Sequence, residues 1–399
     1  MTRTLKQIVE NGLCHGCGAC ASVTPSLAME MKPSGYLRPE ADENSHVGED
    51  AIEAVCSGIA LDHQNLEADY HPLWGPIRRL ATGHATDPET RHRGSSGGVL
   101  SALQLFLVEQ GEVDYVLSTS ADPQDPIGTA TSMRSDRQAI LGAAGSRYAP
   151  SSPLANLGEH LAKGRPFAFV GKPCDVAALR RMASHDPRID RLIPYKLAFF
   201  CAGVPSRKGT IDVLSALETR EEDVDRFQYR GDGWPGLARV VRKDGSDASM
   251  TYNDSWGKIL NRHLQFRCKI CPDGTGEFSD IACADAWYGK DGYPDFTERD
   301  GRSLIVARTE AGERLLALAQ KAGVLAAQPL AVEEIEAMQP YQANRKRNAL
   351  ARSSALWAKR GNGPRFSGLK LPALTLRTSP IELARNFWGT FKRIKGPLG

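Results

Sequence analysis

Three cysteines near the start of the sequence have the spacing of a metal-binding loop. Cys14, Cys17 and Cys20 are separated from one another by two residues. Three thiolates at this spacing wrap a short loop around one cuboidal iron–sulfur cluster, whereas zinc sites usually combine separate C-x2-C pairs. Glycines let the backbone turn tightly at such a cluster. The segment contains three of them, Gly12, Gly16 and Gly18. The spacing therefore favours an iron–sulfur cluster over a zinc ion.

The fourth ligand of this cluster must come from another part of the chain. In ferredoxins the triplet continues as C-x3-C-P, and that next cysteine normally binds a second cluster. Thr24 and Pro25 occupy those two positions here, so the proline is present and the thiol is absent. Cys56 is the only nearby cysteine outside the triplet. We therefore predict one [4Fe–4S] cluster whose ligands are Cys14, Cys17, Cys20 and Cys56.

A second set of four cysteines lies in the middle of the chain. Cys174 follows one predicted strand and precedes a helix, and Cys201 follows the next strand. If these strands are parallel, both thiols lie at the carboxyl edge of the sheet, where open α/β sheets bind ligands. With Cys268 and Cys271 they would form a second tetrathiolate site; zinc or separate buried thiols are the alternatives. The remaining cysteine, Cys283, is expected to be a buried free thiol.

The number of cysteines also indicates the compartment. The chain has nine cysteines in 399 residues, and structural disulfides are rare in the cytosol, so metal binding or redox chemistry is the better explanation. The first residues lack the apolar stretch of a signal peptide. No segment approaches the ~18 consecutive apolar residues of a membrane span. We therefore expect a soluble, cytoplasmic protein.

Alternating strands and helices are predicted to position these cysteines. The predicted strands are 79–84, 113–118, 167–170, 197–200 and 304–307, and the predicted helices are 97–110, 175–182 and 310–322. This alternation predicts an α/β core with a mixed sheet, α+β in the chain as a whole. We expect three parts: a small ferredoxin-like cluster module at 1–75, the core at 76–340 and a basic helical tail at 341–399.

The tail is strongly basic. It contains thirteen Lys or Arg residues and one acid, Glu382, and its charge of +12 leaves −9 for the rest of a chain whose net charge is +3. Ser379 and Glu382 have the spacing of a capping box, with Pro380 at the first helical position. The helix is predicted to dock on the protein itself, on a partner or on a membrane surface. Its apolar face would comprise Ile381, Ala384, Phe387, Trp388, Phe391 and Ile394. No aromatic-rich nucleic-acid motif accompanies the charge, so nucleic acid is not an expected partner.

Several short motifs follow one another between residues 12 and 322, and their order is specific. They are the Cys14 triplet, Gly94-Ser95-Ser96-Gly97-Gly98, Gly145-Ser146-Arg147-Tyr148, Gly171-Lys172-Pro173-Cys174, Gly231-Asp232-Gly233-Trp234-Pro235-Gly236, Cys268-x2-Cys271 and Asp285-Ala286-Trp287. In this order they resemble the β-subunit family of coenzyme F420 hydrogenase and formate dehydrogenase. Relatives of that family include 7-hydroxymethyl chlorophyll a reductase and ferredoxin-dependent 8-vinyl reductases. The basic tail lies outside the resemblance.

The resemblance implies FAD bound near the clusters. The Ser-Gly loop precedes a helix, whose positive amino-terminal end would face a pyrophosphate. The residues implied in cofactor binding are Ser95, Ser96, Gly97, Gly98, Ser146, Arg147, Gly233 and Trp234. Candidates for a catalytic proton donor are His92, Tyr148, Lys172 and Asp232.

These features favour an iron–sulfur flavoprotein oxidoreductase. Ferredoxin or another one-electron partner would reduce two [4Fe–4S] clusters, which would pass the electrons to FAD and then to a small organic substrate. One alternative is an electron-transfer subunit that reduces the deazaflavin coenzyme F420 within a larger complex. A second is a metal-stabilised accessory module of polysaccharide biosynthesis, which zinc without flavin would favour. An oligomer is compatible with each of these functions.

Overall fold

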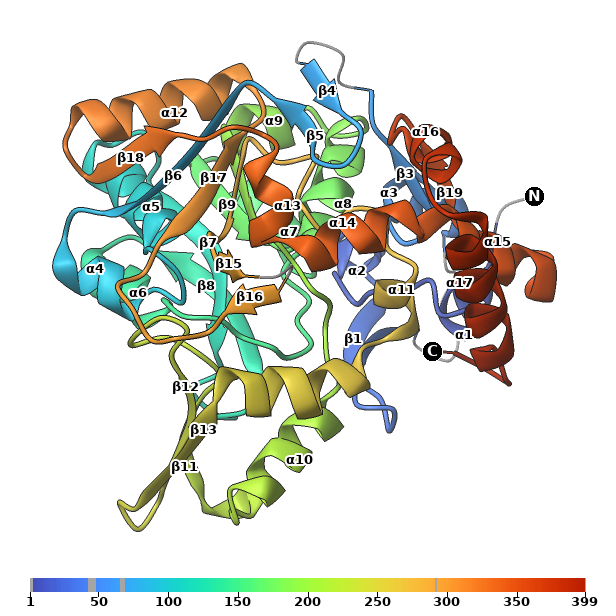
Figure 1. The fold of residues 1–399 in the computed structure, drawn as a ribbon, viewed down its shortest axis with the longest axis horizontal. Helices are drawn as coiled ribbons and strands as arrows, with labels where there is room; N and C mark the ends of the chain where they lie inside the picture. Colours follow the sequence, from blue (N-terminus) through green and yellow to red (C-terminus); the bar gives the residue numbers. More distant parts are fainter. Residues whose placement is uncertain (1–2, 42–47, 65–68, 291–292, 399) are drawn as a thin grey trace.

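A mixed sheet forms the centre of the molecule (Figure 1). The computed structural model describes residues 3–41, 48–64, 69–290 and 293–398. Within these ranges the largest sheet has eight strands in the order β18-β6-β17-β14-β10-β9-β7-β8. Their bounds are β6 Arg79–Ala85, β7 Tyr115–Ala121, β8 Thr129–Arg134, β9 Phe167–Gly171, β10 Tyr195–Phe199, β14 Ile281–Asp285, β17 Ser303–Ala307 and β18 Leu325–Pro329. The predicted α/β fold with a mixed sheet is confirmed, and each predicted strand overlaps one of these strands.

The directions of the strands explain where the motifs gather. The neighbouring pairs β7–β9, β9–β10 and β10–β14 are parallel. β6 runs in the same direction as β14, because antiparallel β17 lies between them. The carboxyl ends of β6, β9, β10 and β14 therefore meet at one edge of the sheet. The loops after these strands carry the Ser-Gly motif, Cys174, Cys201 and the Asp285 motif.

Helices cover both faces of this sheet. One face packs against α5 (Val99–Glu109) and α12 (Glu310–Lys321), and the other against α7 (Leu157–Ala162), α8 (Pro173–Ala183) and α9 (Arg188–Leu192). Side chains of a strand alternate between faces. In β9, Phe167 and Phe169 pack on the side of α8, and Ala168 and Val170 on the side of α5. Each large side chain buried in this way contributes ~1.5–3 kcal/mol.

The two ends of the chain share one core. The amino-terminal part comprises α1 (Leu5–Glu10), α2 (Ala19–Val23), β1 (Leu27–Met31), β2 (Leu37–Ala41), α3 (Glu49–Val55), β3 (Ala60–Asp62), β4 (Asp69–His71) and β5 (Gly75–Ile77). The carboxyl-terminal part comprises α13 (Glu334–Met338), α14 (Pro340–Arg347), α15 (Ala349–Arg360), β19 (Arg365–Ser367), α16 (Leu371–Leu376) and α17 (Pro380–Arg393). β19 pairs in parallel with β3, and Leu356 and Ile394 pack with Ile8 and Leu13. The red and blue segments accordingly lie side by side in Figure 1.

A smaller lobe extends from the core at the bottom of Figure 1. Its antiparallel sheet contains β11 (Val224–Gln228), β12 (Leu237–Arg242) and β13 (Asp247–Thr251). It packs with α10 (Arg207–Ala216) and the helical turns Asn253–Ile259 and Leu260–His263. The remaining elements are α4 (Pro88–Arg93), α6 (Arg137–Gly142), the turn Glu221–Asp223, α11 (Phe266–Lys269), β15 (Tyr288–Lys290) and β16 (Tyr293–Asp295).

The start of α17 differs from the prediction. Pro380 does occupy the first turn of the helix, but the Ser379 side chain makes no capping hydrogen bond. Glu382 Oε1 instead accepts a hydrogen bond from Asn348 Nδ2 at 2.6 Å. The predicted capping box is therefore not formed, because the carboxylate that would complete it is used to attach α17 to the preceding helices.

The protein covers only part of the apolar face predicted for α17. Ile381 and Trp388 of that face are exposed, whereas Ile394 is buried. α17 packs against α15, and Arg352 Nε of α15 donates to Asn386 Oδ1 at 2.9 Å. Because the polar side of α17 contacts Arg352, the side chains of Ile381 and Trp388 on its apolar side face the solvent. Among the described helices, none is both long and apolar enough to cross a bilayer.

Candidate functional site

The first cysteine set lies where three short helices meet. Cys14 and Cys17 lie in the loop between α1 and α2, Cys20 is in the first turn of α2, and Cys56 caps the end of α3. Burial raises the pKa values of Cys17, Cys20 and Cys56, and the charges of neighbouring cysteines of the set raise them further, which shows that the four thiols lie close together. The structure therefore brings together the four residues predicted to bind the first cluster.

The loop that carries this set is fixed by its neighbours. Gly18 has φ +85°, and an added Cβ would lie 2.6 Å from the backbone nitrogen of Ala155, so only glycine fits the turn. The Leu154 amide donates to the Cys17 carbonyl at 2.9 Å, and Ser152 Oγ donates to the Gly16 carbonyl at 2.7 Å. The segment after residue 150 thus holds the loop against the core.

The second cysteine set lies at the carboxyl edge of the sheet. β9 and β10 are parallel neighbours, so Cys174, in the first turn of α8, and Cys201, after β10, leave the sheet at the same edge. Cys268 is in α11 and Cys271 follows it. Burial, then the adjacent Cys268 thiol, raises the pKa of Cys201 to about 12. Burial and then Asp175 raise the pKa of Cys174, and the nearby thiols of Cys201 and Cys268 raise it further. Cys283 lies instead in the middle of β14 in the apolar core, where burial raises its pKa to about 12.

The spacing of the ligand atoms distinguishes between a single ion and a cluster. A tetrahedral zinc ion with Zn–S bonds of about 2.3 Å holds its sulfurs less than about 4 Å apart. In the described part of the chain, the one group of three or more His, Cys, Asp or Glu ligand atoms all within 4.8 Å of one another is His15, Cys174 and Asp175. Neither cysteine set has that zinc-like spacing. A cuboidal cluster binds each thiolate at a different iron and so suits wider sets.

The chemistry of the thiols also fits a cluster. Burial is the main reason that the pKa values of Cys17 and Cys56 lie above the ordinary value. A buried thiolate without a counter-charge is unfavourable, and iron supplies that charge in place of the protons. Both cysteine sets are therefore compatible with [4Fe–4S] clusters as their resident groups.

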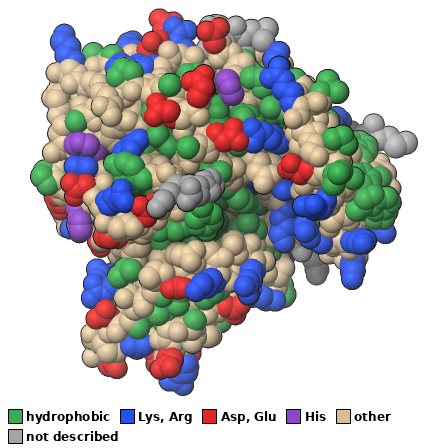
Figure 2. All heavy atoms as spheres, in the orientation of Figure 1, with side chains coloured by type: hydrophobic (Ala, Val, Ile, Leu, Met, Phe, Trp, Pro, Cys, Tyr) green, Lys and Arg blue, Asp and Glu red, His purple; other side chains and the backbone are tan. Residues whose placement is uncertain are grey.

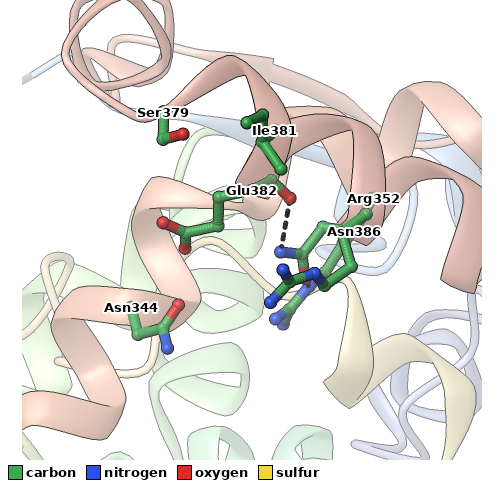
Figure 3. Close-up of a pocket in the computed structure, with 7 residues that line it drawn as sticks. Asn344, Arg352, Ser379, Ile381, Glu382 and Asn386 are labelled. Carbon is green, nitrogen blue, oxygen red and sulfur yellow. Dashed lines mark hydrogen bonds between the residues drawn. The ribbon is translucent and has the colours of Figure 1, made fainter.

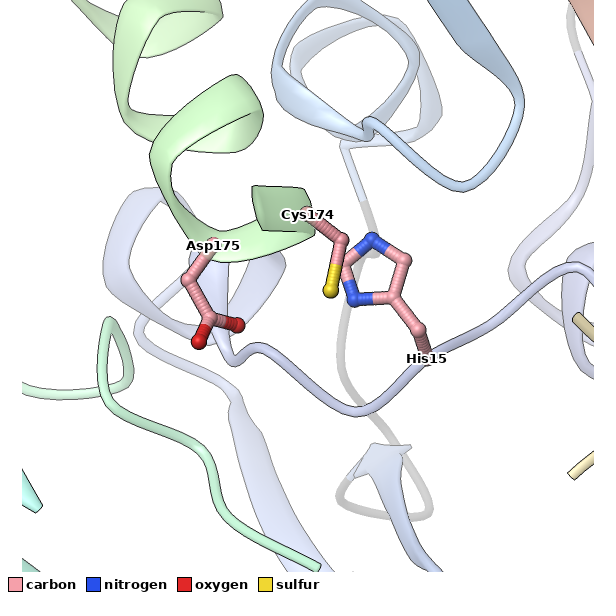
Figure 4. Close-up of side chains that lie close together, drawn as sticks. All are labelled: His15, Cys174 and Asp175. Atoms are coloured by element: carbon pink, nitrogen blue, oxygen red, sulfur yellow. The ribbon is translucent and has the colours of Figure 1, made fainter. Parts of the chain in front are cut away.

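His15 connects the two sets. Its Nε2 lies 2.7 Å from Ser57 Oγ, and Ser57 Oγ donates to the Cys174 carbonyl at 2.8 Å. Because the serine proton is used, Nε2–H of His15 must be the donor to Ser57, which leaves the Nδ1 lone pair free. Figure 4 shows the Cys174 Sγ between the His15 ring and the Asp175 carboxylate. Burial, then the nearby Arg267, holds the pKa of His15 well below its ordinary value, so the ring is neutral.

Lys172, a candidate catalytic residue, lies buried between the two sets. Its Nζ is 2.8 Å from Asp175 Oδ2 and donates to Ser151 Oγ at 2.6 Å. Burial raises the pKa of Asp175, and Asp175 is one of the charges that act on Cys17. Although burial disfavours its charge, Lys172 has a raised pKa because of Asp175 and then Cys174. The Lys172 ammonium thus pairs with Asp175 and lies near the thiols of Cys174 and Cys201.

Replacing Lys172 with methionine is expected to leave the buried Asp175 carboxylate without its counter-charge, with only the amide of residue 172 still donating to it, at a cost of about 3–5 kcal/mol of unfolding free energy at pH 8. The pKa of Asp175, already raised by burial, would rise further. The folded state then binds more protons than the unfolded state, so stability falls as pH increases and the loss is smaller at pH 5. Urea denaturation at the two pH values measures this trend. Lys196→Met is the control, because its partner Asp190 is exposed; an equal trend in both variants would contradict the assignment.

A buried arginine from the basic tail reaches the second set. Arg345 of α14 is 4% exposed. Its two terminal nitrogens donate to the carbonyls of Cys201, at 2.7 Å, and Cys268, at 2.6 Å. Although burial disfavours its charge, the thiols of Cys271 and its neighbours hold the pKa of Arg345 above the ordinary value. The tail therefore contributes a cation to this site.

The Ser-Gly loop lies on the same sheet edge, before α5. An added Cβ at Gly97 would lie 2.8 Å from the Ser303 nitrogen, so glycine allows the loop to touch β17. Ser96 Oγ contacts the Arg302 carbonyl at 3.0 Å, and the Gly97 amide donates to Ser303 Oγ at 2.9 Å. Ser95 Oγ accepts from Ser146 Oγ at 2.7 Å. These hydroxyls fix the loop in place, with the amino terminus of α5 behind it.

Arg147 lies between the small lobe and the core. Its terminal nitrogens donate to the carbonyls of Phe227, at 2.8 Å, and Pro126, at 3.0 Å. Its guanidinium lies 4.9 Å from the centre of the Tyr229 ring. These contacts attach the small lobe to the core. Ser146, in contrast, faces the Ser-Gly loop through Ser95.

The Trp234 loop forms a buried ion pair with β14. Trp234 is 1% exposed and donates from Nε1 to Asp285 Oδ1 at 2.8 Å. Arg230 donates to both Asp285 oxygens, at 2.9 and 2.6 Å. Trp234 and Trp287 stack with centroids 4.8 Å apart, and the Arg230 guanidinium lies over Tyr252 and Trp287. Sequence reasoning identified both motifs but missed Arg230, which directly precedes the glycine-rich segment.

The other candidate proton donors occupy different positions. Tyr148 packs against Trp256 at 4.7 Å and is one of the groups that, after burial, raise the pKa of Tyr252 beside Arg230. His92 and Asp232 are exposed, and the Gly233 amide donates to the His92 carbonyl at 3.0 Å. Tyr148 thus lies among the aromatic side chains beside Arg230. His92 and Asp232 lie at the exposed edge of the Trp234 loop, and Lys172 lies between the cysteine sets.

Family models match most of the core. Models described as coenzyme F420 hydrogenase/dehydrogenase beta subunit match residues 80–158 (its N-terminal part) and 164–333 (its C terminus). The chain is 28% identical over 266 residues to the coenzyme F420 hydrogenase subunit beta of Methanococcus voltae, covering 63% of this chain and 84% of the relative.

Two other comparisons extend this result. The chain is 25% identical over 374 residues to the coenzyme F420-dependent sulfite reductase of Methanocaldococcus jannaschii, covering 87% of this chain but about half, 52%, of that protein. A chain in the solved F420-reducing [NiFe] hydrogenase complex from Methanosarcina barkeri superposes with a TM-score of 0.56 at 19% identity, over 74% of this chain and 98% of that one. The second likeness shows that the fold is shared.

Proposed function

Because the chain belongs to the coenzyme F420 hydrogenase/dehydrogenase beta-subunit family and is an oxidoreductase, we propose that it transfers electrons between iron–sulfur clusters and the deazaflavin coenzyme F420. A partner subunit or another redox protein supplies or accepts the electrons. Relatives named for F420-linked hydrogenase and sulfite reductase support this alternative over the main prediction from the sequence, in which ferredoxin and FAD serve a small organic substrate.

One observation carries the proposal. The two cysteine sets lie next to each other, joined through His15, Ser57 and Cys174, and the second set opens on the sheet edge that also bears the Arg230–Asp285 pair. Electron transfer requires such closely placed centres that lead to one substrate site. In this proposal Cys14, Cys17, Cys20 and Cys56 hold one [4Fe–4S] cluster, and Cys174, Cys201, Cys268 and Cys271 hold the other.

FAD remains part of the proposal as the group between the clusters and F420. When bound, a flavin pairs single electrons and so supports hydride chemistry. The amino terminus of α5, behind the fixed Ser-Gly loop, would face its phosphates. Trp234 and Trp287 provide a stacked aromatic wall, and Tyr148 adjoins Tyr252, whose ring lies 5.8 Å from that of Trp287. Arg230 is neutralised by Asp285, so it orients the wall rather than binding a negative charge.

The proposed function is tested with anaerobically purified protein. Reduced methyl viologen serves as the one-electron donor, and loss of the visible absorbance of oxidised F420 is followed over time. We expect turnover with F420 and none with NAD⁺ under the same conditions. If protein that contains its clusters reduces neither F420 nor NAD⁺, the proposal is contradicted. If it instead turns over with ferredoxin and a small organic acceptor, the main prediction from the sequence is supported.

Replacing Arg345 with glutamine is expected to lower the reduction potential of the second cluster. The change removes a buried positive charge beside three thiolates, and net charge and hydrogen bonding set cluster potentials. Redox titration followed by electron paramagnetic resonance measures the shift. Arg347→Gln is a matched control, because the neighbouring Arg347 pairs with Glu336 on the outer side of α14. Equal potentials in the wild type and the Arg345 variant would contradict this role.

A further inference from the structure

The outer surface of α16 and α17 exposes large apolar side chains. Leu376, at the end of α16, is 89% exposed, Ile381 is 73% exposed and Trp388 is 56% exposed. Ile381 and Trp388 are seven residues apart, and therefore lie on one side of α17. Figure 2 shows hydrophobic side chains gathered over α16 and α17 at the right of the molecule, with Lys and Arg side chains beside them. We call this surface the tail face.

The protein itself uses the opposite side of α17. Glu382 and Asn386 bond to the preceding helices, and Ile394 is buried with Leu13 and Leu356. The helix is thus fixed by a polar and partly apolar inner side. The exposed apolar residues are not needed for this packing, and they require a separate explanation.

The exposed charged residues that α16, α17 and the residues after them contribute to the tail face are all basic. Exposed basic residues on or next to it are Arg377, Arg385, Lys392, Arg393 and Lys395. The one acid of the whole segment 341–399 is Glu382, and it faces inward to Asn348. A partner that matches this surface must therefore be anionic and must also accept isolated apolar side chains.

A polar pocket opens beside the exposed apolar residues. It has a volume of about 490 Å³ and is lined by Asn344, Arg352, Ser379, Ile381, Glu382, Arg385 and Asn386. Figure 3 shows Asn344 and Glu382 on one side of it and Arg352 with Asn386 on the other. Its two arginines outnumber its one carboxylate. Guanidinium groups bind phosphate well, and the pocket therefore suits one phosphate group at the level of the surface.

We propose that the tail face docks on an anionic lipid bilayer. Tryptophan is favoured at the headgroup level, and exposed leucine and isoleucine gain by entering the boundary of the acyl chains. The surrounding Lys and Arg residues are attracted by anionic headgroups, and one headgroup phosphate enters the Arg352–Arg385 pocket. Nucleic acid fits less well, because Leu376 and Ile381 cannot stack on bases. The docking holds the redox core at the bilayer through the part of the chain that lies outside the family models.

The test uses the full-length protein with its clusters and sucrose-loaded vesicles. Vesicles of phosphatidylcholine alone are compared with vesicles that also contain phosphatidylglycerol, and bound protein is measured by sedimentation. We expect binding to the anionic vesicles only, weakened by added salt because the charges are exposed. Ile381→Ser with Trp388→Ser is expected to lower the binding constant about tenfold or more. The separate charge variant, Arg385→Glu with Lys392→Glu, should lower it as well.

A matched control separates docking from a general effect of apolar surface. Ile211 and Leu237 are also exposed, at 37% and 46%, and lie on the small lobe. Ile211→Ser with Leu237→Ser should bind as the wild type does. The proposal is overturned if wild-type protein shows no preference for anionic vesicles, or if the tail variant and the control variant bind equally. Absence of vesicle binding with tight binding to an acidic protein would assign the tail face to a protein partner instead.

Discussion

Replacing Cys17 with alanine is expected to abolish F420 reduction and to remove roughly half of the cluster iron, about four of eight atoms per chain. Cys17 is 7% exposed and lies within electrostatic range of Cys20 and Cys56. No other described cysteine lies in its loop except its two proposed co-ligands. Losing one of four ligands leaves three partly buried thiols without a compensating metal charge, and stability should fall together with iron content.

Cys283 is the matched control for this variant. It is also buried, at 5% exposed, but it packs within β14 among apolar side chains. Cys283→Ala should keep its iron, its acid-labile sulfide and its activity. Iron and sulfide are measured on the same anaerobic sample as the rate. Equal iron in the wild type and Cys17→Ala would show that this cysteine is not a ligand.

Breaking the Arg230–Asp285 pair is expected to lower both the stability of the fold and its affinity for F420. Asp285→Asn leaves the 2%-exposed Arg230 guanidinium without its bidentate partner, and weakens the hydrogen bond from Trp234 Nε1. Removing one member of a buried pair costs about 3–5 kcal/mol. We expect that loss in urea denaturation, together with weaker F420 binding measured by titration, because the Trp234–Trp287 wall loses its anchor.

A double-mutant cycle tests whether the effect comes from the pair. The variant Arg230→Met with Asp285→Leu removes both charges, so it should be more stable than Asp285→Asn alone. Asp295→Asn is the surface control, because its partner Arg299 lies in the same region but the pair is exposed. It should unfold like the wild type. Additive losses from the two single changes at 230 and 285 would mean that the ion pair contributes nothing of its own.

The central strands of the core could be predicted from the sequence, because both of their faces are buried and they are apolar runs, whereas the partly exposed edge strands β8 and β18 were not predicted. Phe167–Gly171 and Ser303–Ala307 are fully buried and were predicted within one residue. The termini of α17 were harder. The sequence pattern of Ser379 and Glu382 predicted a local cap, but a tertiary hydrogen bond from Asn348 to Glu382 replaced it. Local patterns contain no information about such a competing partner.

The candidate site was predicted unevenly for the same reason. The spacing of Cys14, Cys17 and Cys20 depends on neighbours in the chain and is visible in the sequence. The contacts of Arg345 with Cys201 and Cys268 span 144 and 77 positions, and one buried arginine in a basic tail cannot be distinguished from its exposed neighbours by type. Pairing at long separation in the chain becomes visible only when the fold is known.

The most direct test of the account is to measure iron, acid-labile sulfide, zinc and flavin in one anaerobically purified sample. The central claim is that both cysteine sets hold iron–sulfur clusters that exchange electrons with F420 through a flavin. It predicts about eight irons, eight sulfides, one FAD and no zinc per chain. About four irons with FAD would remove the second cluster from the account. Zinc without flavin would contradict the account, and would favour the metal-stabilised accessory module that the sequence also allows.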